Sequence, residues 1–122
     1  MKTVLVVDDS QIMRNIIKNM VLTLKMPCQF VEAANGEDAL RQMQAKEIDL
    51  VFLDWNMPKV SGIEFLKMVR SIDKYKTLPI IMVTSEAARY SVIEALKNGA
   101  TDYITKPVDQ WTFQEKIAKL GI

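Results

Sequence analysis

Three short stretches of the sequence are apolar at every position, and this feature limits the fold more than any other. They are VLVV (4–7), LVFL (50–53) and IIMV (80–83). Such short runs, apolar on both sides, are typical of strands in a parallel sheet that helices cover on both faces. A segment with apolar residues at helical spacing follows each of them, so strands and helices alternate along the chain.

The full pattern predicts five strands and five helices. We place the strands at 3–7, 29–34, 50–53, 79–83 and 101–105. We expect the first helix to run from Ser10 to before Pro27, and a short second helix over 37–45 to follow a turn at Asn35–Gly36. Gly62 opens the third helix, and the fourth covers 87–98 and ends at Gly99. The last helix is marked by Phe113, Ile117 and Leu120. The second and fifth strands contain polar residues, which indicates edge strands. With right-handed crossovers the predicted fold is a doubly wound α/β domain over residues 1–122, with a five-stranded parallel sheet of order 2-1-3-4-5.

Polar residues follow the strands at the carboxyl edge of this sheet. Asp8 and Asp9 follow the first strand, Asp54 the third, Thr84–Ser85 the fourth and Lys106–Pro107 the fifth. Ligands bind to such sheets at the switch point, here between strands one and three. We therefore expect these side chains to form one site.

Three carboxylates at one edge repel each other. At about 4 Å and an effective dielectric near 20, each pair costs on the order of 4 kcal/mol. Lys106 supplies one compensating charge, and a Mg²⁺ ion held by carboxylates is the expected second. This set suits phosphoryl transfer, with Asp54 as the nucleophile because it stands alone at the centre, and with Asp8 and Asp9 as metal ligands.

Composition excludes several other classes of site. The chain has no histidine, so imidazole-based catalysis and histidine metal sites are absent. Its single cysteine, Cys28, cannot form an internal disulfide, which fits a reducing cytoplasm. A net charge of +1 with mixed signs does not favour nucleic-acid binding, and no apolar run is long enough for a membrane span.

Each residue also has a simpler structural interpretation. Asp8–Asp9 could merely cap the first helix, where Ser10 is another candidate cap, and Thr84–Ser85 can cap the fourth. Lys106 taken alone would be a solvated surface charge. Only their shared position with Asp54 at one sheet edge favours a functional site.

Four motifs in register extend this interpretation to a family. The four motifs, in chain order, are VLVVDDS, DWNMP with SG shortly after it, MVTSE, and YITKP. With these motifs, the whole chain resembles the receiver domain of two-component response regulators. DWNMP and Glu86 are similar to the single-domain chemotaxis branch. Val108 departs from the phenylalanine often found after the Lys-Pro pair, and this position lies on the surface that would bind partners.

The resemblance implies a role for each matching residue. Asp54 would be the phosphoacceptor, and Mg²⁺ would bind Asp8, Asp9, Asp54 and the backbone carbonyl of Asn56. Thr84 and Lys106 would contact phosphoryl oxygens. Tyr103 would rotate inward as Thr84 moves and so change the surface of the fourth helix, fifth strand and fifth helix. Taken without the resemblance, Tyr103 would simply pack against a helix.

The expected function is that of a stand-alone response regulator and not of an enzyme. We expect a cytoplasmic monomer without an output domain, phosphorylated by a histidine kinase and binding a flagellar motor switch protein or a phosphatase, but neither nucleic acid nor membrane. A phosphorelay intermediate or phosphate sink that exchanges phosphoryl groups with a histidine phosphotransfer protein is the alternative. A magnesium phosphohydrolase is disfavoured, because Asn56 stands where such enzymes carry a second aspartate.

Overall fold

A parallel sheet of five strands forms the centre of the computed structural model, which describes residues 1–85 and 89–121. The strands are β1 (Lys2–Val7), β2 (Cys28–Ala33), β3 (Leu50–Leu53), β4 (Ile80–Thr84) and β5 (Asp102–Thr105). Their order is β2-β1-β3-β4-β5, as the sequence predicts, with β2 and β5 at the edges. The switch point therefore lies between β1 and β3.

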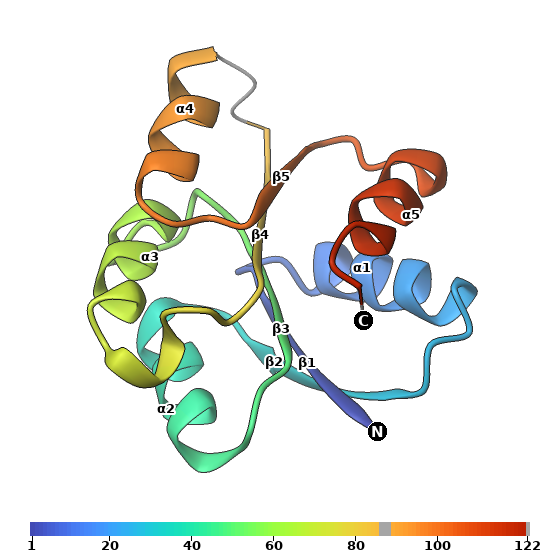
Figure 1. Cartoon of the computed structure of the whole chain (residues 1–122), viewed down its shortest axis with the longest axis horizontal. Coiled ribbons are helices and arrows are strands. Elements are labelled where there is room, and N and C mark those ends of the chain that lie inside the picture. The colour runs from blue at the N-terminus through green and yellow to red at the C-terminus, as the bar shows by residue number, and fades with distance from the viewer. Residues whose placement is uncertain (86–88, 122) are drawn as a thin grey trace.

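Helices cover both faces of the sheet. Among the described residues they are α1 (Gln11–Thr23), α2 (Gly36–Ala45), α3 (Gly62–Arg70), the 3-10 helix η1 (Asp73–Tyr75), α4 (Arg89–Lys97) and α5 (Gln110–Ala118). Figure 1 shows α1 and α5 on one side of the sheet and α2, α3 and α4 on the other. None of the helices in this part of the chain has the length and apolar character needed to cross a bilayer.

The element boundaries differ from the sequence prediction at a few places. The helix expected to stop at Pro27 already ends at Thr23, because Lys25 adopts a left-handed φ of 59°. The Asn35–Gly36 turn is in fact a helix start, since the Asn35 side chain accepts a hydrogen bond from the amide of Asp38 and Gly36 is the first helical residue. Of the helix predicted over 87–98, residues 87 and 88 lie outside the described part of the chain.

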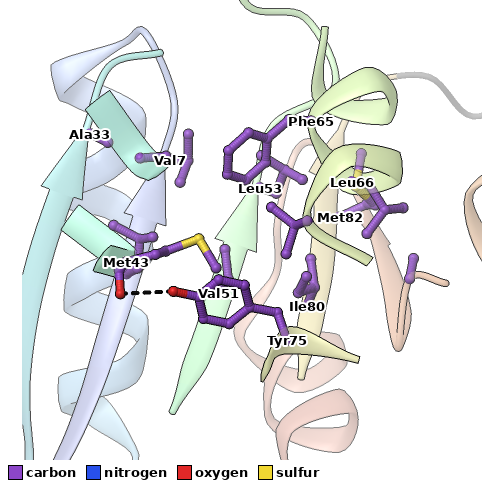
Figure 2. Packing of buried hydrophobic residues seen from close by; sticks show 14 of the residues in the cluster. Val7, Ala33, Met43, Val51, Leu53, Phe65, Leu66, Tyr75, Ile80 and Met82 are labelled. Carbon is purple, nitrogen blue, oxygen red and sulfur yellow. Dashed lines mark hydrogen bonds between the residues drawn. The ribbon is translucent and has the colours of Figure 1, made fainter. Parts of the chain in front are cut away.

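Two layers of apolar side chains fill the space between the sheet and the helices. Figure 2 shows part of the layer beneath α2 and α3, where Leu53 and Met82 of the sheet face Phe65 of α3. Tyr75 closes this layer, and its hydroxyl donates a 3.0 Å hydrogen bond to the carbonyl oxygen of Met43 (Figure 2). The central strands β1, β3 and β4 are buried on both faces, so they hold their carboxyl ends rigidly.

The first helix presents some of its apolar residues to solvent. Ile17 and Val21 are buried against the sheet, whereas Ile12 and Ile16 are exposed. Helical spacing indicates that all four belong to the helix, but only the packing decides which of them face the core.

Candidate functional site

Three carboxylates meet at the carboxyl edge of the central strands. One oxygen from each of Asp8, Asp9 and Asp54 lies within 4.8 Å of the others. Asp8 and Asp54 are buried, with 1% and 4% of their surface exposed, and Asp9 is exposed. The backbone explains the close approach, because the amide of Asp54 donates a 2.9 Å hydrogen bond to the carbonyl of Val7 at the end of β1.

Lys106 places an ammonium group between the two buried carboxylates. Its Nζ atom lies 3.1 Å from Asp54 Oδ1 and 3.2 Å from Asp8 Oδ2. The loop after β5 carries Lys106 to this position, where its amide donates a 2.8 Å hydrogen bond to the carbonyl of Thr84. The peptide bond between Lys106 and Pro107 is cis.

The electrostatics of this group leave it short of positive charge. Burial and the neighbouring Asp8 carboxylate raise the pKa of Asp54 above its usual value, although Lys106 opposes the shift. Burial disfavours the charged form of Lys106, but the carboxylates of Asp54 and Asp8 outweigh it and raise the pKa of Lys106. Lys106 pairs with two of the three carboxylates, and its single positive charge does not neutralise the group.

The donor set fits a hard divalent cation. Asp8, Asp9 and Asp54 offer only oxygen atoms, and the described residues contribute no histidine or thiolate to the group. Magnesium and calcium prefer such ligands, whereas zinc sites use nitrogen and sulfur. A divalent ion would also supply the positive charge that Lys106 alone does not.

Most of the predicted site residues lie at this edge of the sheet. Thr84 is fully buried at the end of β4, beside Thr105 in the strand register. Asn56 is exposed, two residues after Asp54. Tyr103 of β5 is 9% exposed, lies beside Met82 in the strand register and packs in the same apolar layer as Phe65. Glu86 lies outside the described residues.

The first helix begins directly beside the carboxylates, and Ser10 is its N-cap. The Ser10 side chain accepts a 3.2 Å hydrogen bond from the amide of Met13. The Ser10 amide in turn donates to Asp8 Oδ1 at 2.9 Å. Ser10 therefore provides the cap, and Asp9 is left at the site.

Two further residues shape the site, and the sequence prediction did not include them. Gly62 opens α3 against the backbone of Asp54 and Trp55, and its amide donates a 2.7 Å hydrogen bond to the Trp55 carbonyl. Arg14 of α1 donates a hydrogen bond to the carbonyl oxygen of Asp8. For Gly62 the sequence signal was its place in the SG motif, and for Arg14 it was a basic residue one helical turn after Ser10.

Comparison with known proteins points to one family. The model of the "Response regulator receiver domain" family matches residues 4–118. The chain is 40% identical over 117 residues to the chemotaxis protein CheY of Pseudomonas aeruginosa, covering 96% of this chain and 94% of that protein. It is also 40% identical to CheY-3 of Vibrio cholerae, covering 96% and 89%. The solved structure of Vibrio cholerae CheY4 superposes with a TM-score of 0.87 at 33% identity and covers 98% of each chain.

Proposed function

This chain belongs to the response regulator receiver domain family, and on that premise we propose that it is a CheY-type regulator phosphorylated on Asp54 in a Mg²⁺-dependent reaction. One observation carries the proposal most directly. Asp54 is buried at the switch point with its carboxylate 3.1 Å from the Lys106 ammonium and in one group with Asp8 and Asp9. This is the arrangement that a carboxylate nucleophile for phosphoryl transfer needs.

Asp8, Asp9, Asp54 and the backbone carbonyl of Asn56 would hold the Mg²⁺ ion. The grouping of three carboxylate oxygens within 4.8 Å of one another supports this assignment. Burial, and after it the Asp8 carboxylate, raises the pKa of Asp54, and a bound cation would oppose both effects. When bound, the ion supplies charge that stabilises the phosphoryl oxygens during transfer.

A histidine kinase would be the phosphoryl donor. An oxygen of the Asp54 carboxylate forms the new P–O bond while the P–N bond of the phosphohistidine breaks, and the electron pair of that bond stays on the imidazole nitrogen. Lys106 binds one phosphoryl oxygen and Thr84 donates a hydrogen bond to another. CheY-type receivers are signalling phosphoacceptors, and we propose that this chain likewise has no separate substrate to turn over.

The phosphoryl group would act as a switch for protein binding. It replaces one carboxylate charge with a group of charge near −2 and three acceptor oxygens, which gives Thr84 and Lys106 new partners. Their movement would bias Tyr103 between two positions and so change the surface of α4, β5 and α5. A shift from 1:99 to 99:1 needs about 5.5 kcal/mol of differential binding, which a few charge-assisted hydrogen bonds can supply.

The surface proposed for the output carries exposed apolar side chains. Tyr90, Ile93 and Leu96 of α4 are 71%, 48% and 47% exposed, and Trp111 of α5 is 71% exposed. Exposed aromatic and aliphatic residues of this kind are typical of protein-binding surfaces. A flagellar motor switch protein or a phosphatase is the proposed partner, bound by a stand-alone cytoplasmic monomer.

The chemical step can be tested with a small phosphodonor. The protein is incubated with acetyl phosphate and MgCl₂, and intact mass spectrometry detects the added phosphoryl group. We expect the wild type to gain one group, and we expect no gain with Asp54→Asn or after chelation of Mg²⁺. Phosphorylation of Asp54→Asn at the wild-type level would disprove the assignment of the phosphoacceptor.

The output can be tested with beryllofluoride, which mimics the phosphoryl group on an aspartate. Purified flagellar switch protein is titrated onto the chain with and without the mimic. Binding that tightens with the mimic supports chemotaxis output. Rapid reversible exchange with a histidine phosphotransfer protein, together with no effect of the mimic on switch-protein binding, would replace the motor role with that of a relay or phosphate sink.

A further inference from the structure

Arg14 connects the carboxylate site to the edge of the sheet. Its Nη1 atom donates a hydrogen bond to the carbonyl oxygen of Asp8. Its Nε atom donates to Glu32 Oε1 on β2 at 3.0 Å, and its Nη2 atom donates to Gln11 Oε1 at 2.7 Å. Only 12% of the Arg14 side chain is exposed, so this guanidinium is held in one place by three oxygen atoms.

The contact with Asp8 fixes a peptide group within the proposed metal site. The amide of Asp8 donates to the carbonyl of Ala33 at 3.1 Å, and its carboxylate accepts from Ser10 and Lys106. Arg14 holds the remaining polar group of Asp8, its carbonyl. Because a peptide unit is planar, fixing this carbonyl also fixes the orientation of the Asp9 amide and the position of the Asp9 Cα atom, from which its side chain starts.

Asp9 depends on this restraint more than the other two acids do. Asp8 and Asp54 are buried and contact Lys106, whereas Asp9 is exposed at the end of the loop. A metal site binds more tightly when its ligands are already oriented, because less conformational entropy is lost on binding. The orientation of the peptide before Asp9 is therefore part of the affinity of the site.

We infer that Arg14 and Glu32 form a clamp that positions the Asp8–Asp9 loop for a divalent cation. The inference rests on the proposed function, since it concerns the same metal site. Arg14 is a positioning residue that acts through the Asp8 carbonyl, and Glu32 orients its guanidinium from the neighbouring strand. Hydrogen bonds from Lys18 and Arg14 lower the pKa of Glu32, so this partner stays ionised.

The geometry requires an arginine. The guanidinium has donors that point in fixed directions, and here they reach Asp8, Glu32 and Gln11 together. A lysine at position 14 has one ammonium on a flexible stem and cannot reproduce the planar set of contacts. Arg14→Lys should consequently restore only part of the positioning.

Lys18 provides a matched control. Its Nζ atom forms a 2.9 Å ion pair with the other oxygen of Glu32 and belongs to the same helix as Arg14. Lys18→Ala removes an ion pair of the same cluster while the contact from Arg14 to the Asp8 carbonyl remains. A purely structural role of the cluster would make the two alanine variants alike.

The test is a calorimetric titration of the metal-free protein with MgCl₂, combined with thermal unfolding without metal. We expect Arg14→Ala to bind Mg²⁺ about tenfold more weakly, the lower end of the usual range for outer partners of metal ligands. The Mg²⁺ affinity of Arg14→Lys should lie between those of Arg14→Ala and the wild type. Both Arg14→Ala and Lys18→Ala should lower the melting temperature, but Lys18→Ala should keep the wild-type Mg²⁺ affinity. Glu32→Gln should show a smaller loss than Arg14→Ala.

Two results would overturn the inference. One is wild-type Mg²⁺ affinity in Arg14→Ala, and the other is an equal loss in Lys18→Ala. If Arg14→Ala does not fold, the comparison of Arg14→Lys and Glu32→Gln with Lys18→Ala decides in the same way. Absence of Mg²⁺ binding in the wild type would instead disprove the proposed metal-dependent function, and the clamp with it.

Discussion

Gly62 lies so close to Asp54 that a Cβ atom at position 62 would stand 2.1 Å from the backbone oxygen of Asp54. The contact joins the start of α3 to the loop that carries the proposed phosphoacceptor. Only a residue without a side chain allows this approach, and the Gly62 amide uses it to donate to the Trp55 carbonyl. The shape of the site therefore depends on a residue that contributes no chemistry to it.

Gly62→Ala should destabilise the protein strongly. The new methyl group meets backbone atoms, which cannot rotate away, so we expect a loss of about 3 kcal/mol or more in the free energy of unfolding, measured by urea denaturation. Gly36→Ala is the control, because its Cβ would lie 3.1 Å from the Phe65 ring, whose side chain can shift. Equal losses in both variants would contradict this explanation.

Mg²⁺ should stabilise the folded state. At a free concentration about 100 times its dissociation constant, the ion should add about 2.7 kcal/mol to the free energy of unfolding. Asp9→Asn should reduce this gain while leaving metal-free stability almost unchanged, since Asp9 is exposed. Asp73→Asn alters an exposed acid away from the site and should keep the full gain.

Asp54→Asn should increase stability in the absence of metal. The pKa of Asp54 is raised in the folded state, so the folded protein binds the Asp54 proton more tightly than the unfolded chain does. The contribution of Asp54 to the free energy of unfolding therefore falls as the pH rises from the usual pKa of an aspartate through the raised pKa. The asparagine cannot ionise and avoids this loss. Lys106 keeps Asp8 as its partner in this variant, so we expect a gain of roughly 1 kcal/mol at neutral pH.

Urea denaturation at several pH values tests the direction of this pH dependence. The difference between Asp54→Asn and the wild type should grow from acidic pH towards neutrality and become constant above the raised pKa. A difference that is largest in acid would mean that the folded state favours the Asp54 charge.

Lys25→Gly should stabilise the end of α1. Lys25 follows the C-cap residue Leu24 and has a left-handed φ of 59°, which costs a side-chain-bearing residue about 1 kcal/mol that glycine avoids. Lys46→Gly is the matched control, since Lys46 ends α2 with a φ of −138°. That variant should gain nothing or lose stability, and thermal unfolding compares the two.

Ile93→Asp should separate phosphorylation from output. Ile93 is 48% exposed on α4, so a charge there should weaken mimic-dependent binding of the switch protein at least tenfold while acetyl phosphate still labels Asp54. Ile12→Asp places the same charge on α1, where Ile12 is 73% exposed. If Ile12→Asp abolishes switch-protein binding and Ile93→Asp does not, the partner binds near α1 instead.

Parts of the fold could be predicted because they depend on local patterns. Apolar character on both sides identified β3 at Leu50–Leu53 with the bounds that the structure has. The same pattern distinguished the central strands from the two edge strands. The patterns were less reliable at the ends of elements. Residues 79–83 were predicted as the fourth strand, whereas β4 runs from Ile80 to Thr84, because strand pairing across the sheet sets the ends and is not local.

The sequence by itself determined that Asp8, Asp9, Asp54, Thr84 and Lys106 stand at one edge of a parallel sheet. That follows from strand order and chain direction, which the apolar pattern encodes. Only the tertiary structure decided that Lys106 lies between Asp8 and Asp54, that Arg14 reaches the Asp8 carbonyl, and that Ile12 faces solvent while Ile17 is buried. These are contacts between segments distant in the chain or choices between faces of one helix, and they are fixed by packing and loop geometry that no local pattern of residues contains.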